Sequence, residues 1–221
     1  MRVILWSMRS RIVRLASVAC ASLILGLAGC SLADRAGSGV APLAGSAMTD
    51  RATPVTIYSN LGNSKRTYRC CIAWTIGGPH SKIGKQWLAA PFTLSADRMA
   101  TSVQLAVTWS LGANAGLTVA LADDRNGHPG KDLVMSQVAP NLPKFNHCCI
   151  VQSVGFAAAS PLSKGVRYWV VVRTNAATAG TVDNWQNNST GAGGVIDSQN
   201  GKGWGGANVG KGLPAFAVFG R

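Results

Sequence analysis

Residues 99–109, MATSVQLAVTW, decide the fold class of this chain, because the larger apolar side chains recur at every second position. Val103, Leu105, Val107 and Trp109 fall on one face of an extended chain, and smaller or polar residues fall on the other. A period of two residues is typical of a β-strand with one face against a core. The stretch therefore predicts a half-buried strand.

Comparable short apolar runs, bounded by turn residues, lie on both sides of this stretch. None of them has the 3.6-residue period of an amphipathic helix. We therefore expect an all-β fold over residues 54–221, a β-sandwich of jelly-roll or lectin-like type. The Gly- and Asn-rich stretch 175–212 is expected to form loops. The other strands are expected at 55–58, 70–76, 116–121, 150–156, 166–173 and 216–219.

The composition favours the same fold and weighs against an enzyme. The chain has 221 residues, and all eight acidic residues are Asp. Exposed helix faces are usually filled with Glu and Lys, and Gly, of which there are 26, breaks helices. The absence of Glu also weakens the case for a pair of glycosidase carboxylates. Because no G-x-S-x-G elbow, phosphate loop or dinucleotide fingerprint occurs either, we expect no catalysis and no cofactor.

Residues 1–29 have the pattern of an export signal. Four Arg and no acidic residue precede an apolar stretch at 15–27, which is shorter than the roughly 20 residues of a spanning helix. The stretch leads into Leu27-Ala28-Gly29-Cys30, which resembles the lipobox of bacterial lipoproteins. The resemblance implies a lipid on Cys30, and Ser31 after it implies the outer membrane, facing the periplasm or the cell surface. The alternative is an ordinary cleaved signal with Cys30 as a chance thiol.

Residues 30–53 are mostly small or polar, which predicts a flexible tether between the anchor and the domain. Removal of 1–29 lowers the formal charge of +13 by its four Arg, to +9. The remaining basic residues are scattered, apart from a small cluster of Lys65, Arg66 and Arg69. This pattern disfavours nucleic acid as a partner and suits an anionic envelope polymer or lipid headgroups.

Four cysteines, Cys70, Cys71, Cys148 and Cys149, occur as two pairs of neighbours. An exported domain lies in an oxidising compartment, so structural disulfides are the preferred interpretation. Neighbours in a strand point to opposite faces, so antiparallel pairing of the two segments would place Cys70 opposite Cys149 and Cys71 opposite Cys148. The sequence leaves all three connectivities open. The alternatives are a metal site, with His147 as a further ligand, and a thiol redox site.

Trp185 and Trp204 are the candidate ligand-binding aromatics, since both stand among Gly and amide or other polar residues. An indole face covers the C–H surface of a sugar, while amides such as those of Asn184 and Asn187 bond its hydroxyls. The alternative is that both rings cap an open end of the sandwich.

No metal site is expected. Asp123, Asp124 and Asn126, ahead of Gly127, offer a calcium-binding alternative, but they lack the closing Glu of an EF-hand. The preferred interpretation of these residues is a hairpin loop built from turn formers.

Four pieces of the domain follow one another in a recognisable order: GLTVALADDRNGHPGKDL at 116–133, PLSKGVRYWVVV at 161–172, DNWQNN at 183–188 and LPAFAVFG at 213–220. Together they resemble the choice-of-anchor β-sandwich domains of exported bacterial proteins. The resemblance implies a lectin-like fold and no settled activity. We therefore expect a lipid-anchored binding module for a glycan or another envelope polymer. The alternative is a structural or assembly lipoprotein that acts through protein contacts.

Overall fold

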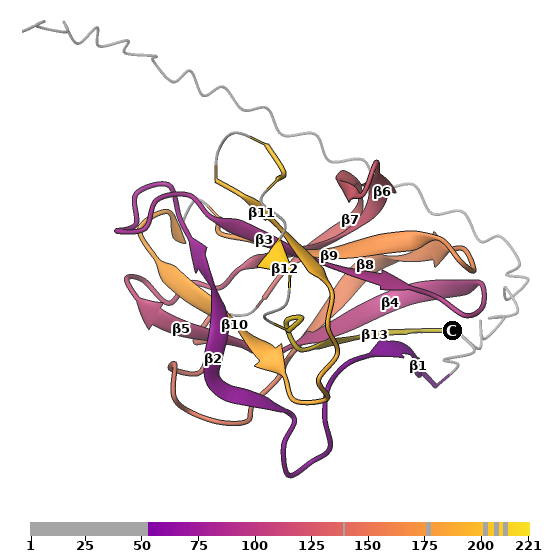
Figure 1. Cartoon of the computed structure of the whole chain (residues 1–221), viewed down its shortest axis with the longest axis horizontal. Coiled ribbons are helices and arrows are strands. Elements are labelled where there is room, and N and C mark those ends of the chain that lie inside the picture. Colours follow the sequence, from indigo (N-terminus) through magenta and orange to yellow (C-terminus); the bar gives the residue numbers. More distant parts are fainter. Residues whose placement is uncertain (1–52, 139, 176–177, 201–202, 206–207, 210–211) are drawn as a thin grey trace, which may run out of the picture. The chain divides into compact units, whose positions relative to one another are not determined.

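The computed structural model describes residues 53–221 except 139, 176–177, 201–202, 206–207 and 210–211, and these residues form the β-sandwich drawn in Figure 1. The predicted signal peptide, the predicted lipidation site Cys30 and the predicted tether up to residue 52 lie outside the described residues. Within the described part, no helix is long and apolar enough to cross a membrane. The expected all-β fold is confirmed.

One layer of the sandwich is a six-stranded antiparallel sheet. Its strands are β3 (Trp87–Thr93), β6 (Thr118–Arg125), β7 (His128–Gln137), β9 (Arg167–Arg173), β11 (Val195–Gln199) and β12 (Asn208–Val209). They lie side by side in the order β12-β11-β3-β9-β6-β7, so β7 is an edge strand.

The facing layer consists of two smaller antiparallel sheets. Their strands are β1 (Val55–Ser59), β2 (Tyr68–Gly77), β4 (Arg98–Leu105), β5 (Val107–Leu111), β8 (Gln152–Leu162), β10 (Val182–Asn188) and β13 (Phe216–Gly220). The order is β1-β13-β4-β8 in one sheet and β2-β10-β5 in the other. Ala106 joins them, because its N–H donates to Ala215 O at 3.1 Å and its carbonyl accepts from Gln186 N–H at 2.8 Å.

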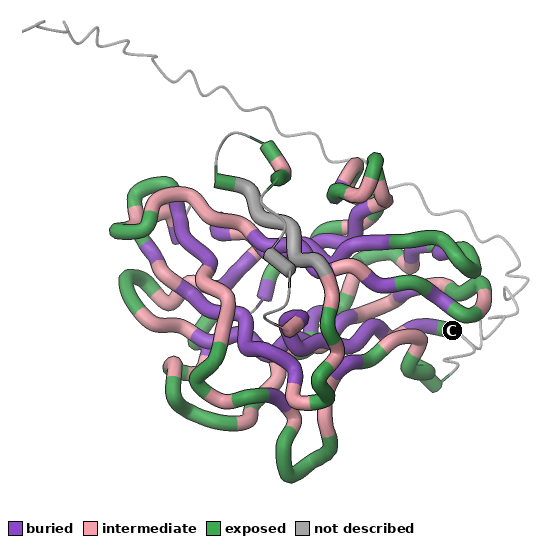
Figure 2. Tube along the Cα trace, viewed as in Figure 1, coloured by how far each residue is buried: buried purple, intermediate pink, exposed green. Residues whose placement is uncertain are grey.

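The core lies between the two layers. Val103, Leu105 and Val107 are fully buried in it, as the alternation at 99–109 predicts, and Trp109 is half-buried. Figure 2 shows buried residues along the strands and exposed residues at many of the turns. The side chains that the six-stranded sheet contributes to this core include Leu88, Phe92, Val119, Leu121, Tyr168, Val170 and Val172.

The expectation of loops throughout 175–212 is wrong, because β10, β11 and β12 lie there. β10 is central in its sheet, between β2 and β5, and its side chains are largely buried although most of them are polar. A pattern of apolar residues does not reveal such a strand. β3 and β7 are not among the predicted strands either. β3 contains Pro91, and in β7 Pro129 and Gly130 directly follow the first residue of the strand. Pro and Gly usually mark the end of a strand rather than its interior.

The hairpin between β6 and β7 is tighter than the loop expected from its sequence. Only Asn126 and Gly127 separate the two strands. Both residues have positive φ angles, 56° and 83°. A two-residue turn of type I′ needs positive φ at both positions, and the pair Asn-Gly adopts it most readily.

Candidate ligand-binding groove

β10 carries amide side chains that are buried and hydrogen-bonded to hydroxyls of the neighbouring strand β5. Asn184 Nδ2 donates to Ser110 Oγ, and Gln186 Nε2 donates to Thr108 Oγ1 at 2.8 Å. Buried polar groups need such partners, because they no longer bond to water. Asn184 therefore has a structural role, and its predicted contact with a ligand is not supported, since the residue is buried.

Trp185 is fully buried, at 0% exposure, and its indole Nε1 donates to the carbonyl oxygen of Ala215 at 3.0 Å. Its ring lies 5.9 Å from the ring of Phe216, centroid to centroid. A side chain without exposed surface cannot touch a ligand. The prediction of Trp185 as a ligand contact is therefore wrong, and the ring has a packing role instead.

Trp204 is half-buried and does not share a site with Trp185. It packs against a small apolar cluster of the six-stranded sheet. The residues of this cluster alternate with those that enter the core, so they lie on the outer face of the sheet. The structure thus does not bring the two predicted aromatics together. The members of the cluster are Ala89, Ala120, Ala122, Trp169 and Val171.

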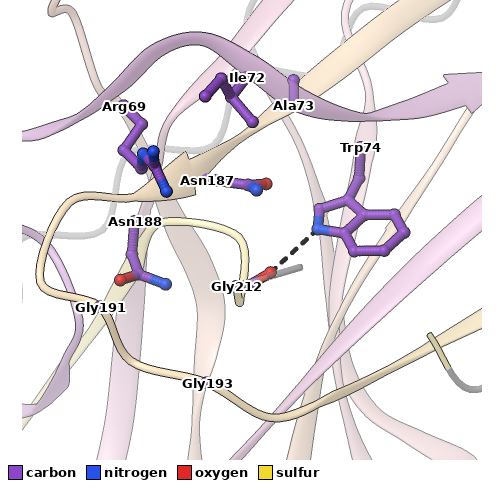
Figure 3. A pocket seen from close by; sticks show the side chains of 9 residues that line it. All are labelled: Arg69, Ile72, Ala73, Trp74, Asn187, Asn188, Gly191, Gly193 and Gly212. Atoms are coloured by element: carbon purple, nitrogen blue, oxygen red, sulfur yellow. Dashed lines mark hydrogen bonds between the residues drawn. The ribbon is translucent and has the colours of Figure 1, made fainter. Parts of the chain in front are cut away.

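A cavity of about 510 Å³ opens beside β2 and the end of β10 (Figure 3). In Figure 3, Arg69 and Trp74 lie on opposite sides of it, and the Asn187 amide lies between them. Trp74 Nε1 donates to the carbonyl oxygen of Gly212 at 3.1 Å, which fixes the orientation of the indole. Among the residues predicted at a ligand, Asn187 is the one that lines this cavity, beside Asn188.

A second cavity, of about 530 Å³, shares Arg69, Ile72 and Gly191 with the first, so the two adjoin. We call the two cavities together the groove. Lys65 and Arg66 line the second cavity, and with Arg69 they make the groove cationic. Among the residues that the structure describes, none of these three side chains forms an ion pair. The basic cluster seen in the sequence therefore lies at the groove, with no acidic partner among the described residues.

A bulge in β2 forms the rim between the two cavities. Asn187 pairs with Arg69, whereas the residue before it on β10 pairs with Ala73, so residues 70–72 have no partner on that strand. The middle residue of the bulge, Cys71, has a φ of 73°. Bulges bend a strand and redirect its side chains. This one places an exposed isoleucine next to the cationic side chains.

The two cysteine segments do not pair with each other as antiparallel strands, which is the condition for placing Cys70 opposite Cys149 and Cys71 opposite Cys148. Within each pair the sulfurs lie close together: the Sγ atoms of Cys148 and Cys149 are in contact, and those of Cys70 and Cys71 lie 3.2 Å apart. The prediction assumed regular strands, in which neighbours point to opposite faces. One pair lies in the bulge and the other lies before β8, so the assumption holds for neither. Bonding within a pair is one of the three connectivities that the sequence leaves open.

Asp123 and Asp124 serve the β6–β7 hairpin. Asp123 Oδ1 accepts the N–H of Lys131 at 2.5 Å, and Asp124 Oδ2 accepts the N–H of Gly127 at 3.1 Å. Asp124 Oδ1 also accepts from Trp169 Nε1 at 2.8 Å. These contacts fit the hairpin interpretation of the Asp123, Asp124 and Asn126 segment. Across the described residues, no group of three or more His, Cys, Asp or Glu could hold a metal ion.

Asp183 lies in β10, and it is 2% exposed. Burial raises the pKa of its carboxyl to about 7, and a hydrogen bond from Thr181 Oγ1 at 3.2 Å acts in the opposite direction. Its contacts are those of a strand interior, so its protonation bears on the stability of the sandwich.

Sequence reasoning missed Trp74 and Asn188 as groove residues, although one signal was present. The basic cluster at 65–69 stands shortly before Trp74 in the chain, and the two meet again at the groove. No family model matches the chain, and no curated protein matches it, so the functional proposal rests on the chemistry of the groove.

Proposed function

We propose that this chain is a lipid-anchored module of the cell envelope that binds a glycan or another anionic envelope polymer in the groove, without catalysis. The observation that carries the proposal is the groove itself, in which three cations without ion pairs among the described residues adjoin an indole. Each of these groups matches a different part of an acidic sugar polymer.

The cations supply the attraction for acidic groups. A guanidinium such as that of Arg69 binds a carboxylate or phosphate through two parallel hydrogen bonds. Lys65 and Arg66 continue the positive charge into the second cavity. A polymer with acidic groups at regular intervals would contact more than one of these side chains, which favours a chain over a small ion.

Trp74 suits the sugar units, because an indole covers the C–H face of a sugar ring. The amides of Asn187 and Asn188 beside it are buried, and that of Asn188 is bonded to Ala192 and Leu213, so they have structural roles. Gly191 also lines the groove, with a φ of 80°, and a Cβ built there would meet no atom within 4 Å. A ligand can therefore approach the backbone closely at this point.

The anchor in this proposal is a lipid on Cys30, followed by the tether at 30–53. Two or three acyl chains hold a protein at a membrane far more firmly than one. Replacement of Cys30 by Ser should release the protein from the membrane fraction and abolish labelling with a fatty-acid analogue.

The binding proposal is tested by affinity electrophoresis of the native protein through gels that contain polygalacturonate, an acidic glycan, or dextran, a neutral one. We expect retardation by polygalacturonate and a roughly tenfold weaker interaction for Arg69→Gln, since a hydrogen bond to a charged group is worth about 1.5 kcal/mol. Arg125→Gln is the matched control, because Arg125 is exposed at the distant β6–β7 hairpin. Equal retardation of the two variants would contradict the groove, and sedimentation with purified cell-wall sacculi extends the test to a native polymer.

A structural or assembly role is the second candidate, and the edge strand β7 favours it. Met135 on this strand is 57% exposed, and Leu133 beside it is also exposed. A protein partner recovered by crosslinking through β7, together with no retardation by any polymer, would favour this role over glycan binding.

A further inference from the structure

Two segments that are far apart in the sequence meet at the second cavity of the groove. Residues within 65–72 line one side of it, and residues 148–149, which precede β8, line another. Tyr68 connects the two segments, because its hydroxyl donates to the carbonyl oxygen of His147 at 3.3 Å and lies beside the backbone of Ile150. The two segments therefore belong to one surface. We call the surface formed by residues 65–72 and 147–150 the basic face.

Each segment exposes one isoleucine on the basic face. Ile72, in the bulge of β2, is 47% exposed, and Ile150 is 54% exposed. The neighbours of Ile150, Cys149 and Val151, both pack inward against the apolar cluster that includes Tyr68, so the isoleucine between them is left outside. A single exposed isoleucine is ordinary on a protein surface, whereas two beside a cluster of cations need a common explanation.

The charge of the basic face has one sign. Lys65, Arg66 and Arg69 are all exposed, and within the described part of the chain none of them forms an ion pair. Neither of the segments 60–72 and 144–151 contains an acidic residue, and no acidic residue lines the second cavity. A surface that combines such cations with exposed apolar side chains matches a bilayer with anionic headgroups.

We propose that the basic face docks onto the surface of a membrane that contains anionic lipids. Lys65 and Arg66 bind the headgroup phosphates, and Ile72 and Ile150 enter the boundary between the headgroups and the acyl chains. The attraction of the cations falls off within a Debye length, so docking should weaken as the salt concentration rises. The partner differs from the polymer of the proposed function, and docking does not depend on that polymer.

The proposed lipid anchor allows this contact without dictating which face makes it. Residues 30–53 span at most about 80 Å when fully extended. A domain of this size is roughly 40 Å across, so the tether would let any of its faces reach the bilayer. The choice of face then rests with the side chains, and the basic face combines cations with two exposed isoleucines.

Hydrogen exchange locates the contact in the full lipid-anchored protein. The protein is reconstituted into vesicles of phosphatidylcholine alone and into vesicles of equal parts of phosphatidylcholine and the anionic phosphatidylglycerol. We expect severalfold slower backbone exchange of segments 60–72 and 144–151 in the anionic vesicles, and equal exchange of the β6–β7 hairpin in both. Equal exchange of the two segments in the two kinds of vesicle would overturn the proposal.

Vesicle sedimentation then identifies the side chains. The chain of residues 30–221 with Cys30→Ser lacks the lipid and keeps the tether and the whole sandwich, so its binding measures the face alone. Its cooperative urea transition is checked first. We expect it to sediment with the anionic vesicles and not with phosphatidylcholine alone. Lys65→Gln should weaken this binding roughly fivefold, and Ile150→Ser should weaken it roughly tenfold.

A matched control exists for each of the two variants near the other end of β2. Ile83 is 46% exposed, close to the value for Ile150, and Lys82 beside it is exposed. Ile83→Ser and Lys82→Gln remove the same groups away from the basic face, so both should bind anionic vesicles like the unsubstituted chain. Equal losses for the control and its counterpart would overturn the assignment of the face.

Affinity electrophoresis separates this proposal from the proposed function. Ile150 lines neither cavity, so Ile150→Ser should leave retardation by polygalacturonate unchanged while it weakens vesicle binding. Retardation without preference for anionic vesicles would overturn membrane docking alone, and vesicle binding without retardation would overturn polymer binding alone. A dimer in solution that is lost in Ile150→Ser would assign the basic face to a second copy of the chain and overturn the docking proposal.

Discussion

Strands β4 and β10 lie in the same layer of the sandwich, yet they bury different kinds of side chain. β4 turns Val103 and Leu105 into the core and leaves Gln104 half-buried between them. β10 buries Gln186 as well as Trp185. The difference arises because β5 supplies hydroxyls that bond the amides of β10. A strand can therefore be interior without being apolar, provided that its neighbour carries the right partners.

The strongest test of this comparison removes the single large apolar side chain of β10. Trp185→Ala should lower the free energy of unfolding by about 3–5 kcal/mol, because it leaves a cavity in the core and removes the hydrogen bond from the indole to the carbonyl of Ala215. Urea unfolding followed by circular dichroism measures the loss. Trp185→Phe keeps a ring and should lose less. A loss below about 1 kcal/mol for the alanine variant would mean that the polar contacts of β10 hold the strand without its indole.

The second test uses the pH dependence that Asp183 should confer. The pKa of its carboxyl is about 7 in the folded protein, above the ordinary value of 3.8. Between these values the folded protein holds a proton that the unfolded chain has lost. The free energy of unfolding should therefore fall as the pH rises from about 4 to 7, by about 1.4 kcal/mol for each pH unit, and then level off.

Asp183→Asn keeps an oxygen that can accept from Thr181 and cannot ionise. Urea unfolding at a series of pH values should therefore show a flatter profile for this variant and a greater stability than the native protein above pH 7. Identical profiles for the two proteins would contradict the raised pKa.

The smallest expected changes in the free energy of unfolding come from two glutamines, Gln186 in β10 and Gln104 in β4. Gln186→Met should cost about 1–3 kcal/mol, because it leaves the buried Thr108 hydroxyl without its partner. The double variant with Thr108→Val should recover most of that loss. Gln104→Ala breaks only an exposed 3.3 Å bond to Ser153 and should change stability by less than about 0.5 kcal/mol. Equal losses of stability for Gln186→Met and Gln104→Ala would contradict the distinction between β10 and β4.

The same distinction explains how far the sequence predicts the fold. The alternation around Val103 and Leu105 predicts a strand because the buried residues there are also the apolar ones. Gln186 and Asn184 are buried through hydroxyl partners on β5, which the local sequence of β10 does not contain. The all-β class could therefore be predicted from apolar periods, whereas β10 could not.

The groove depends on features that the spacing of apolar residues in the sequence does not reveal. Lys65, Arg66 and Arg69 are recognisable as a cluster, but the bulge that follows Arg69, which lines the same cavity as Trp74, departs from a regular strand. The same bulge brings Cys70 next to its neighbour, against the expectation for an extended chain. Of the predicted ligand contacts, Asn187 alone lines the groove, because Trp185 turns into the core.

β13, at residues 216–220, lies between β1 and β4, and among the strands that the structure describes it is the sole partner of β1. In a chain that passes through a secretion channel from its N-terminus, β1 would emerge first and β13 after every other strand. Until then β1 has no partner, and the core lacks Phe216 and Val218. The sandwich could not close during transit, and its core would be completed only after passage. In an exported chain, the order of strands would thus delay the last step of folding until the end of the domain has passed.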